Sequence, residues 1–134
     1  MRVTGSCHCG DIRFEAEADL ETVGVCHCAD CQKLTGSAWR VNVRAPAESF
    51  RLTGEPTVYV KTADSGARRA HAFCPRCGTP IYSAAADEPA KAYSLRLGTL
   101  SERHHLAPRR QVWKRSALSW SSNLEALPAA AGQG

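Results

Sequence analysis

Apolar and polar residues alternate along several short stretches of the chain, most regularly over residues 11–18. There the sequence DIRFEAEA places an apolar residue at every second position and a charged residue at each position between. Because successive side chains of a β-strand point to opposite faces, this alternation predicts a strand with one buried face. The same alternation recurs in SAWRVNVR (37–44) and KAYSLRLG (91–98), which we also expect to be strands.

Shorter apolar or β-branched runs, separated by turn signals, predict further strands. These runs cover residues 50–52, 57–61, 69–73, 81–84 and 111–114. Helical signal is confined to residues 29–34 and to an ambiguous stretch at 118–127 that ends before Pro128. The pattern therefore predicts an all-β, mainly antiparallel, sandwich-like fold with little helix.

The length of 134 residues suits a single domain, which we place at residues 1–128. The tail 129–134 has no bulky apolar side chain to offset the entropy of ordering it, so we expect it to fray. No apolar stretch is long enough for a membrane span, and the start MRVTGSCHCG lacks the apolar core of a signal peptide. These features predict a soluble, cytoplasmic protein.

The 7 cysteines form three clusters whose spacing suits metal binding better than disulfides. Their number is odd, and their share of the chain is below that of secreted disulfide scaffolds. The pair Cys74-x-x-Cys77, followed by Gly78, is typical of a zinc knuckle. With two residues between them both thiolates can bind one metal, and glycine can adopt the positive φ that the turn requires. A knuckle supplies two ligands, and the pair Cys7-x-Cys9 is the candidate source of the other two.

The third cluster, Cys26-x-Cys28-x-x-Cys31, has no fourth cysteine. If the other pairs close a structural site, this trio holds a metal with one open position, which distinguishes catalytic from structural zinc. Alternatives stay open at both sites: redox-active thiols, another metal, a trio closed by a histidine, or a different division of the sulfurs. His8 and His27 each lie between two cysteines, and we expect them to point away from the shared metal.

A zinc ion held by three anionic sulfurs favours thiol chemistry. It is a weaker Lewis acid towards water than zinc held by three histidines, so hydrolysis is not the expected reaction. Such a site instead suits the uptake of an external thiol, deprotonated but still nucleophilic. The sequence therefore predicts addition of a thiol to a small electrophile.

The charge of the chain argues against a nucleic-acid partner. The formal charge is +4; seven bound thiolates would remove seven positive units and two zinc ions would return four, leaving about +1. Basic residues are scattered in pairs rather than gathered in a stripe. Two other interpretations stay open: a non-catalytic zinc module that binds a protein or nucleic acid, and a redox sensor built on the trio.

Five landmarks together carry a resemblance to a known family. They are GSCHCG (5–10), CHCADCQKLTG (26–36), FCPRCGT (73–79), LGTL (97–100), and Trp120 followed by Leu127-Pro128. On these landmarks the sequence resembles the glutathione-dependent formaldehyde-activating enzyme family, whose members include S-(hydroxymethyl)glutathione synthases and relatives of centromere protein V. The resemblance implies a zinc-bearing, mostly antiparallel β fold.

The resemblance also implies two zinc ions per chain. The second would have only three protein ligands, so we expect it to be the more easily lost. It assigns a structural zinc to Cys7, Cys9, Cys74 and Cys77, and a catalytic zinc to Cys26, Cys28 and Cys31. The implied activity is that of a carbon–sulfur lyase or synthase, whose partners are a small thiol such as glutathione and a small aldehyde such as formaldehyde. No cofactor other than zinc is implied.

Further residues are candidates for substrate contact. Lys33, Arg40 and Arg68 are candidates for binding the carboxylates of glutathione. His71, shortly before the knuckle, is a candidate to support a metal ligand from behind or an exposed residue without a role. We expect the loops after Val43 and between residues 61 and 69 to line the cleft.

Overall fold

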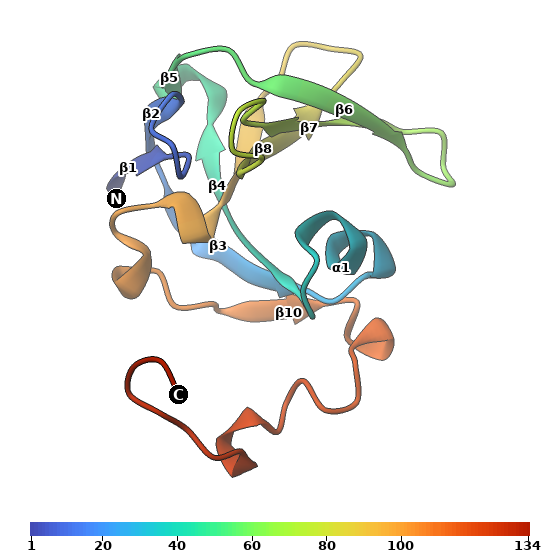
Figure 1. The fold of residues 1–134 in the computed structure, drawn as a ribbon. Coiled ribbons are helices and arrows are strands. Elements are labelled where there is room, and N and C mark those ends of the chain that lie inside the picture. The colour runs from blue at the N-terminus through green and yellow to red at the C-terminus, as the bar shows by residue number, and fades with distance from the viewer.

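The computed structural model describes residues 1–134 and consists mainly of β-strands in two sheets (Figure 1). The smaller, 3-stranded sheet has the order β1 (Arg2–Ser6), β2 (Arg13–Glu17), β5 (Arg51–Thr53). The 7-stranded sheet has the order β10 (Arg110–Val112), β3 (Asp19–Cys26), β4 (Arg40–Pro46), β9 (Ala92–Arg96), β8 (Pro80–Ala85), β7 (Arg68–Phe73), β6 (Thr57–Thr62). All neighbours are antiparallel except β10 and β3, which are parallel. The expected all-β, mainly antiparallel fold is confirmed.

The one α-helix, α1 (Ala29–Thr35), matches the helix expected at residues 29–34. It begins where the Cys28 sulfur accepts a hydrogen bond from the Cys31 amide, and it ends at Gly36, whose φ of 64° closes the last turn. Single 3₁₀ turns lie at Ala47–Ser49, Leu97–Thr99, Arg103–His105, Lys114–Ser116 and Leu124–Ala126. The ambiguous stretch 118–127 therefore contains only the last of these turns. No helix here combines the length and the apolar character that crossing a membrane requires.

Both sheets contribute to one hydrophobic core. The alternation at residues 11–18 is confirmed, because Ile12, Phe14, Ala16 and Ala18 are all buried. The core also contains Val3, Val43, Ile81, Leu95, Leu100 and the sulfur-bearing side chains of Cys7 and Cys74. Residues 129–134 contain no helix or strand and are exposed, and the division into a domain and a frayed tail stays a prediction.

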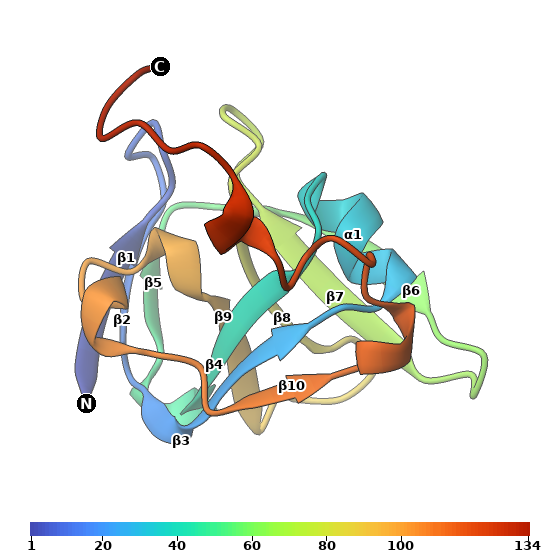
Figure 2. The same ribbon diagram turned by 90° about the horizontal axis from the view of Figure 1, so that it is seen from below.

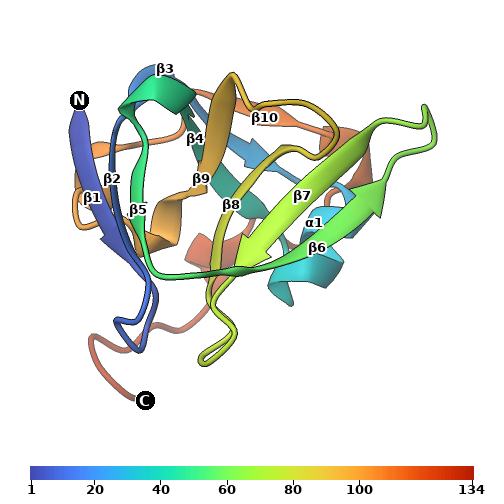
Figure 3. The ribbon, with the colours of Figure 1, turned by 90° about the horizontal axis from the view of Figure 1, so that it is seen from above.

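The larger sheet curves around α1, which lies between its β6–β7 end and its β10 edge (Figures 1 and 3). Strand register places Asn42 opposite Arg96, Ser94 opposite Ser83, and Ser83 opposite His71. Since partners in register share a face, these polar side chains lie on the side of the sheet away from Val43 and Leu95. The part of this polar face that holds Arg40 and Arg96 is buried beside α1, whereas Arg44 on the same face is exposed.

Candidate functional site

Four cysteines from two hairpin loops converge at one end of the molecule. Cys7 and Cys9 lie between β1 and β2, Cys74 and Cys77 lie between β7 and β8, and Figure 3 shows both loops at the same end. All four sulfurs lie within 4.8 Å of one another. Sulfurs at about 2.3 Å from a tetrahedral zinc lie about 3.8 Å apart, and the distances are 3.6 Å for Cys7–Cys9 and 3.7 Å for Cys9–Cys74. Gly78 takes a φ of 79°, as the knuckle requires.

Donors to the Cys7 and Cys77 sulfurs favour the thiolate form that metal binding needs. The amide of Ile12 donates to the Cys7 sulfur at 3.3 Å, and the amide of Cys77 donates to the Cys74 sulfur at 3.5 Å. The Thr79 hydroxyl lies 3.2 Å from the Cys77 sulfur and, together with backbone donors, lowers the pKa of Cys77 to about 5. At Cys9 the Asp11 amide acts in the same direction, but burial and the other three thiols outweigh it and raise the pKa of Cys9 to about 12. The four sulfurs fit a closed metal site in spacing and in chemistry.

The remaining three cysteines meet where β3 passes into α1. Cys26 ends the strand, Cys28 caps the helix and Cys31 lies within it, and their sulfurs are within 4.8 Å of one another. Burial raises the pKa of Cys26 to about 12. Burial acts the same way on Cys28, but the Cys31 amide and the neighbouring thiols outweigh it and lower the pKa of Cys28. No histidine or carboxylate joins this group, so a metal ion held here would keep an open position.

His8 and His27 belong to neither group of sulfurs, as expected from their positions between cysteines. His27 is buried, and its Nε2 lies 2.8 Å from the side-chain oxygen of Gln111. Gln32 of α1 donates to the backbone oxygens of His27, at 2.9 Å, and Ser116, at 3.0 Å. The start of α1 is thus tied to the chain after β10, which turns back past the helix (Figure 2).

The N-terminal end of α1 faces a cavity of about 630 Å³, here called the cysteine cavity, which is lined by Cys28, Asp30, Lys61, Trp113 and residues 62–65 among others. The Lys61 ammonium lies 2.6 Å from the Asp30 carboxylate. That hydrogen bond raises the pKa of Lys61, with further attraction from Cys28 and Cys31, so Lys61 stays charged beside the trio. The loop expected between residues 61 and 69 lines this cavity. The expectation for the loops after Val43 is wrong: β4 continues to Pro46, and no residue of 44–56 lines either cavity.

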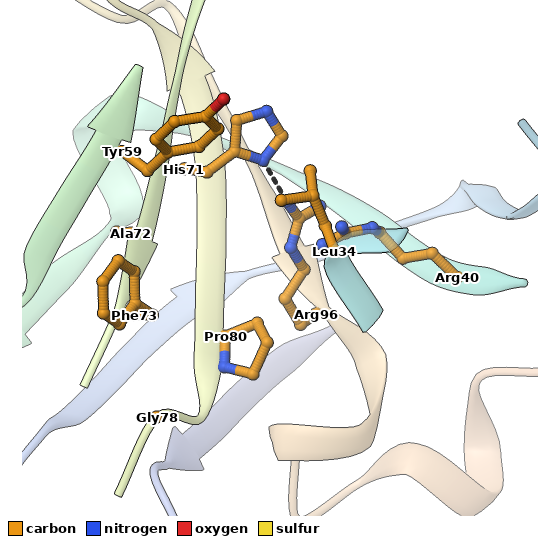
Figure 4. Close-up of a pocket in the computed structure, with 9 residues that line it drawn as sticks. All are labelled: Leu34, Arg40, Tyr59, His71, Ala72, Phe73, Gly78, Pro80 and Arg96. Carbon is orange, nitrogen blue, oxygen red and sulfur yellow. Dashed lines mark hydrogen bonds between the residues drawn. The ribbon is translucent and has the colours of Figure 1, made fainter. Parts of the chain in front are cut away.

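A second cavity of about 440 Å³, the arginine cavity, lies between α1 and the strands β4, β7 and β9 (Figure 4). Its lining residues are Leu34, Arg40, Tyr59, His71, Ala72, Phe73, Gly78, Pro80 and Arg96. Figure 4 shows the side chains of Arg40 and Arg96 converging below Leu34, with Arg96 joined to His71. The cavity thus has apolar walls and two guanidinium groups.

Arg96 is held by two neighbours on the polar face. It donates to the side-chain oxygen of Asn42 at 2.7 Å and to Nδ1 of His71 at 3.0 Å. Burial, with the charges of Arg96 and Arg40, lowers the pKa of His71 to about 4, so the imidazole is neutral at physiological pH. His71 therefore contacts Arg96 rather than a metal ligand. Sequence reasoning did not single out Arg96, because alternation alone places it on a polar face and gives no sign that α1 covers that face.

The three basic residues expected to contact substrate have different surroundings. Arg40 is buried in the arginine cavity. Lys33 is exposed on α1, and Arg68 pairs with Asp87 at 2.6 Å on the surface. Only Arg40 of the three therefore lines the arginine cavity.

Comparison with known proteins agrees with this arrangement. The crystal structure of a Rhodobacter sphaeroides protein superposes with a TM-score of 0.60 at 19% identity, covering 81% of this chain and 98% of the other. At that identity the likeness shows a shared fold. A family model described as glutathione-dependent formaldehyde-activating enzyme matches residues 2–116, a range that contains both groups of cysteines. Since this match spans most of the chain, the protein belongs to the glutathione-dependent formaldehyde-activating enzyme family.

Proposed function

We propose that the protein catalyses the addition of the glutathione thiol to formaldehyde, giving S-(hydroxymethyl)glutathione, and also the reverse reaction as a carbon–sulfur lyase. The proposal assigns the chemistry to Cys26, Cys28 and Cys31 with zinc as the metal. It assigns a second, structural zinc to Cys7, Cys9, Cys74 and Cys77. Family membership supports the two substrates.

One observation carries the proposal: three sulfurs converge without a fourth ligand, while the other four cysteines form a complete set elsewhere. A closed set of four sulfurs serves structure, and a set of three leaves room for a substrate atom. Zinc bound by the trio would supply the positive charge that keeps an incoming thiol deprotonated at neutral pH.

The chain's own groups prepare the reacting atoms. The Cys31 amide donates to the Cys28 sulfur at 3.2 Å, and this hydrogen bond positions the sulfur at the N-terminus of α1. Lys61, whose charge is paired with Asp30 at 2.6 Å, also attracts the thiolates of Cys28 and Cys31 at the cysteine cavity. The cavity, at about 630 Å³, lies in the size range of small-molecule sites.

The reaction itself needs no oxidant or reductant. The substrate thiol loses its proton, and a sulfur lone pair forms the carbon–sulfur bond to the carbonyl carbon. The π bond of formaldehyde breaks, and its oxygen takes up one proton to become the hydroxymethyl group. Reversal of the same steps releases formaldehyde and glutathione, which is the lyase direction.

Native mass spectrometry of the reduced protein, with and without glutathione, tests the proposal together with a rate measurement. We expect two zinc ions and a glutathione adduct, and in Cys28→Ser one zinc ion and no adduct. Because glutathione and formaldehyde also combine without an enzyme, the rate is read by NMR magnetisation transfer between [¹³C]formaldehyde hydrate and the adduct. Ser37→Ala, at an exposed residue just after the same helix and outside both cavities, serves as the control.

Acceleration by wild-type protein that disappears in Cys28→Ser supports the proposal. Two zinc ions without acceleration, or full acceleration in Cys28→Ser, contradicts it. Retention of both zinc ions under mild peroxide would also argue against a redox sensor at the trio.

A further inference from the structure

Two arginines are buried in this protein without a carboxylate partner. Arg40 is 5% exposed and Arg96 is 7% exposed. Neither takes part in any of the chain's ion pairs. Two nitrogens of Arg40, Nε and one terminal nitrogen, and Nε of Arg96 are buried and have no hydrogen-bond partner.

Such an arrangement is unfavourable in a protein that holds no ligand. A buried charge is costly unless it is paired and its donors are satisfied. Burial and the charge of Arg40 lower the pKa of Arg96 only to about 9, so the Arg96 guanidinium stays charged at neutral pH. The fold therefore maintains two positive charges and three free donors side by side.

The charge of the trio accounts for only part of this arrangement. Arg40 lies directly across from Cys26 on neighbouring strands, so thiolates compensate some of the charge. A zinc ion with three thiolates carries a net charge of about −1, which balances one guanidinium but not two. Neither arginine donates a hydrogen bond to a sulfur, so the free donors of both remain available.

The free donors belong to residues that line the arginine cavity. Both arginines line this space of about 440 Å³, as Figure 4 shows. Asn42 and His71 hold the Arg96 guanidinium in place and accept its terminal donors. No acidic residue lines the cavity, so the missing partner is an anion from outside the chain.

We propose that Arg40 and Arg96 form a carboxylate-binding site, positioned by Asn42 and His71, which holds the glycyl carboxylate of the tripeptide thiol while its sulfur lies at the trio. This inference rests on the proposed function and names the group that anchors its substrate. Paired guanidinium groups suit a planar carboxylate, which accepts two parallel hydrogen bonds.

Two arguments select the glycyl carboxylate over the γ-glutamyl one. The γ-glutamyl end also carries an ammonium group, which a cavity with two positive charges and no acidic residue would repel. The glycyl end carries a single negative charge and no cation. An extended tripeptide spans roughly 10 Å, and cross-strand neighbours such as Cys26 and Arg40 have Cα atoms about 5 Å apart, so sulfur and carboxylate reach both sites at once.

Calorimetric titration of the zinc-bearing protein tests the inference with S-methylglutathione and its glycyl monoethyl ester. Neither probe has a free thiol, so binding is measured without turnover. In the wild type we expect the acid to bind at least roughly 30-fold more tightly than the ester, the scale of losing one partner of a buried charge pair. In Arg40→Met we expect the two probes to bind alike.

Arg44→Met is the matched control, because Arg44 lies on the same strand and face but is exposed and outside the cavity. It should keep the wild-type preference for the acid. Thermal unfolding provides a second readout: Arg40→Met should not lower the melting temperature, because it removes a buried, unpartnered charge. If Arg40→Met fails to fold, Arg40→Lys keeps the charge, loses the planar fork, and should show a reduced preference.

Equal binding of acid and ester to the wild type, absence of binding by both, or an unchanged preference in Arg40→Met would each overturn the inference. Failure of the proposed function is distinguishable from these outcomes. If the protein prefers the acid but does not accelerate the formaldehyde reaction, the proposed function is contradicted and the carboxylate site is not. If the protein accelerates the reaction equally for glutathione and its glycyl ester, the carboxylate site is contradicted and the proposed function is not.

Discussion

His71 and Arg96 are joined across the polar face of the large sheet by a hydrogen bond of 3.0 Å between Nδ1 and a guanidinium nitrogen. Because a guanidinium can only donate, the imidazole accepts at Nδ1 and carries its proton on Nε2. The bond therefore fixes both the tautomer of His71 and the direction of Arg96, two residues that are far apart in sequence.

The pKa of His71 makes this contact sensitive to pH. Burial, Arg96, Arg40, Arg69 and Lys61 lower that pKa from 6.5 to about 4. Between these two pH values His71 is protonated in the unfolded chain but neutral in the folded chain. The free energy of unfolding therefore decreases as the pH falls from 6.5 towards 4. We expect His71 to account for about 1 kcal/mol of the stability lost between pH 7 and 5.5.

Urea unfolding of the wild type and His71→Gln over that pH range measures this contribution, since glutamine can accept from Arg96 but does not titrate. The variant should lose less stability on acidification, while protonation of the cysteines affects both proteins alike. Parallel pH profiles for the two proteins would rule out the neutral, half-buried state of His71.

The hydroxyl of Thr79 links the two halves of the four-cysteine site. It accepts from the His8 amide at 3.1 Å and lies 3.2 Å from the Cys77 sulfur. Thr79→Val keeps the shape but removes both contacts, and loss of such a supporting group typically costs roughly 10- to 100-fold in metal affinity. Competition with a zinc chelator should detect this weakening in Thr79→Val and not in Thr57→Val, an exposed threonine on β6.

The sequence predicted the strands whose alternation is regular and missed those where it is broken. Residues 11–18 alternate without interruption, and β2 lies there. In β1 the small Gly5 takes an inward position, and in β3 the pairing with β4 shifts between Asp19 and Gly24, so neither segment shows a clear period. Local pattern cannot report a register shift, because the shift depends on the partner strand.

The same distinction applies to the site. Cysteine spacing within a loop is a local property, and the trio and each of the two pairs come together as that spacing suggested. The meeting of the two pairs, 65 residues apart, is a tertiary contact that spacing alone does not determine. Arg40 and Arg96 alternate with apolar residues exactly as solvent-facing side chains do, yet both are buried. Their burial results from the curvature of the sheet around α1, a tertiary property that no short pattern carries.

Gln32 holds the chain after β10 against α1 through its bonds to the backbone oxygens of His27 and Ser116. Gln32→Ala should leave those oxygens to water and loosen the segment that contains the exposed Trp113 and Trp120. Limited proteolysis should then cut this segment faster than in the wild type or in Lys33→Ala, the exposed neighbour. Unchanged cleavage would mean that packing alone holds the segment.

The absence of a side chain at Gly5 leaves space for the Phe14 ring in the core. A Cβ at position 5 would overlap the ring, whereas a Cβ at Gly98 would meet no atom within 4 Å. Gly5→Ala should therefore lower the free energy of unfolding by about 1–3 kcal/mol through overpacking, and Gly98→Ala should leave it nearly unchanged. Adding Phe14→Leu to Gly5→Ala should recover part of the loss, and chemical denaturation measures all of these variants.

A chelator should remove the two proposed zinc ions in a fixed order, with different consequences for the fold. The trio offers three ligands at the surface of a cavity, whereas the other site offers four, of which Cys7 and Cys74 are part of the hydrophobic core. A three-ligand site holds zinc less tightly, and a metal whose ligands join two loops stabilises the fold directly. During slow titration with chelator, native mass spectrometry should show one zinc lost with little change in melting temperature, and the second lost together with cooperative unfolding.

Cys28→Ser should begin at the one-zinc state with a near-normal melting temperature, and Cys77→Ser should be strongly destabilised. Unfolding that accompanies loss of the first metal would reverse the structural and catalytic assignments of the two sites.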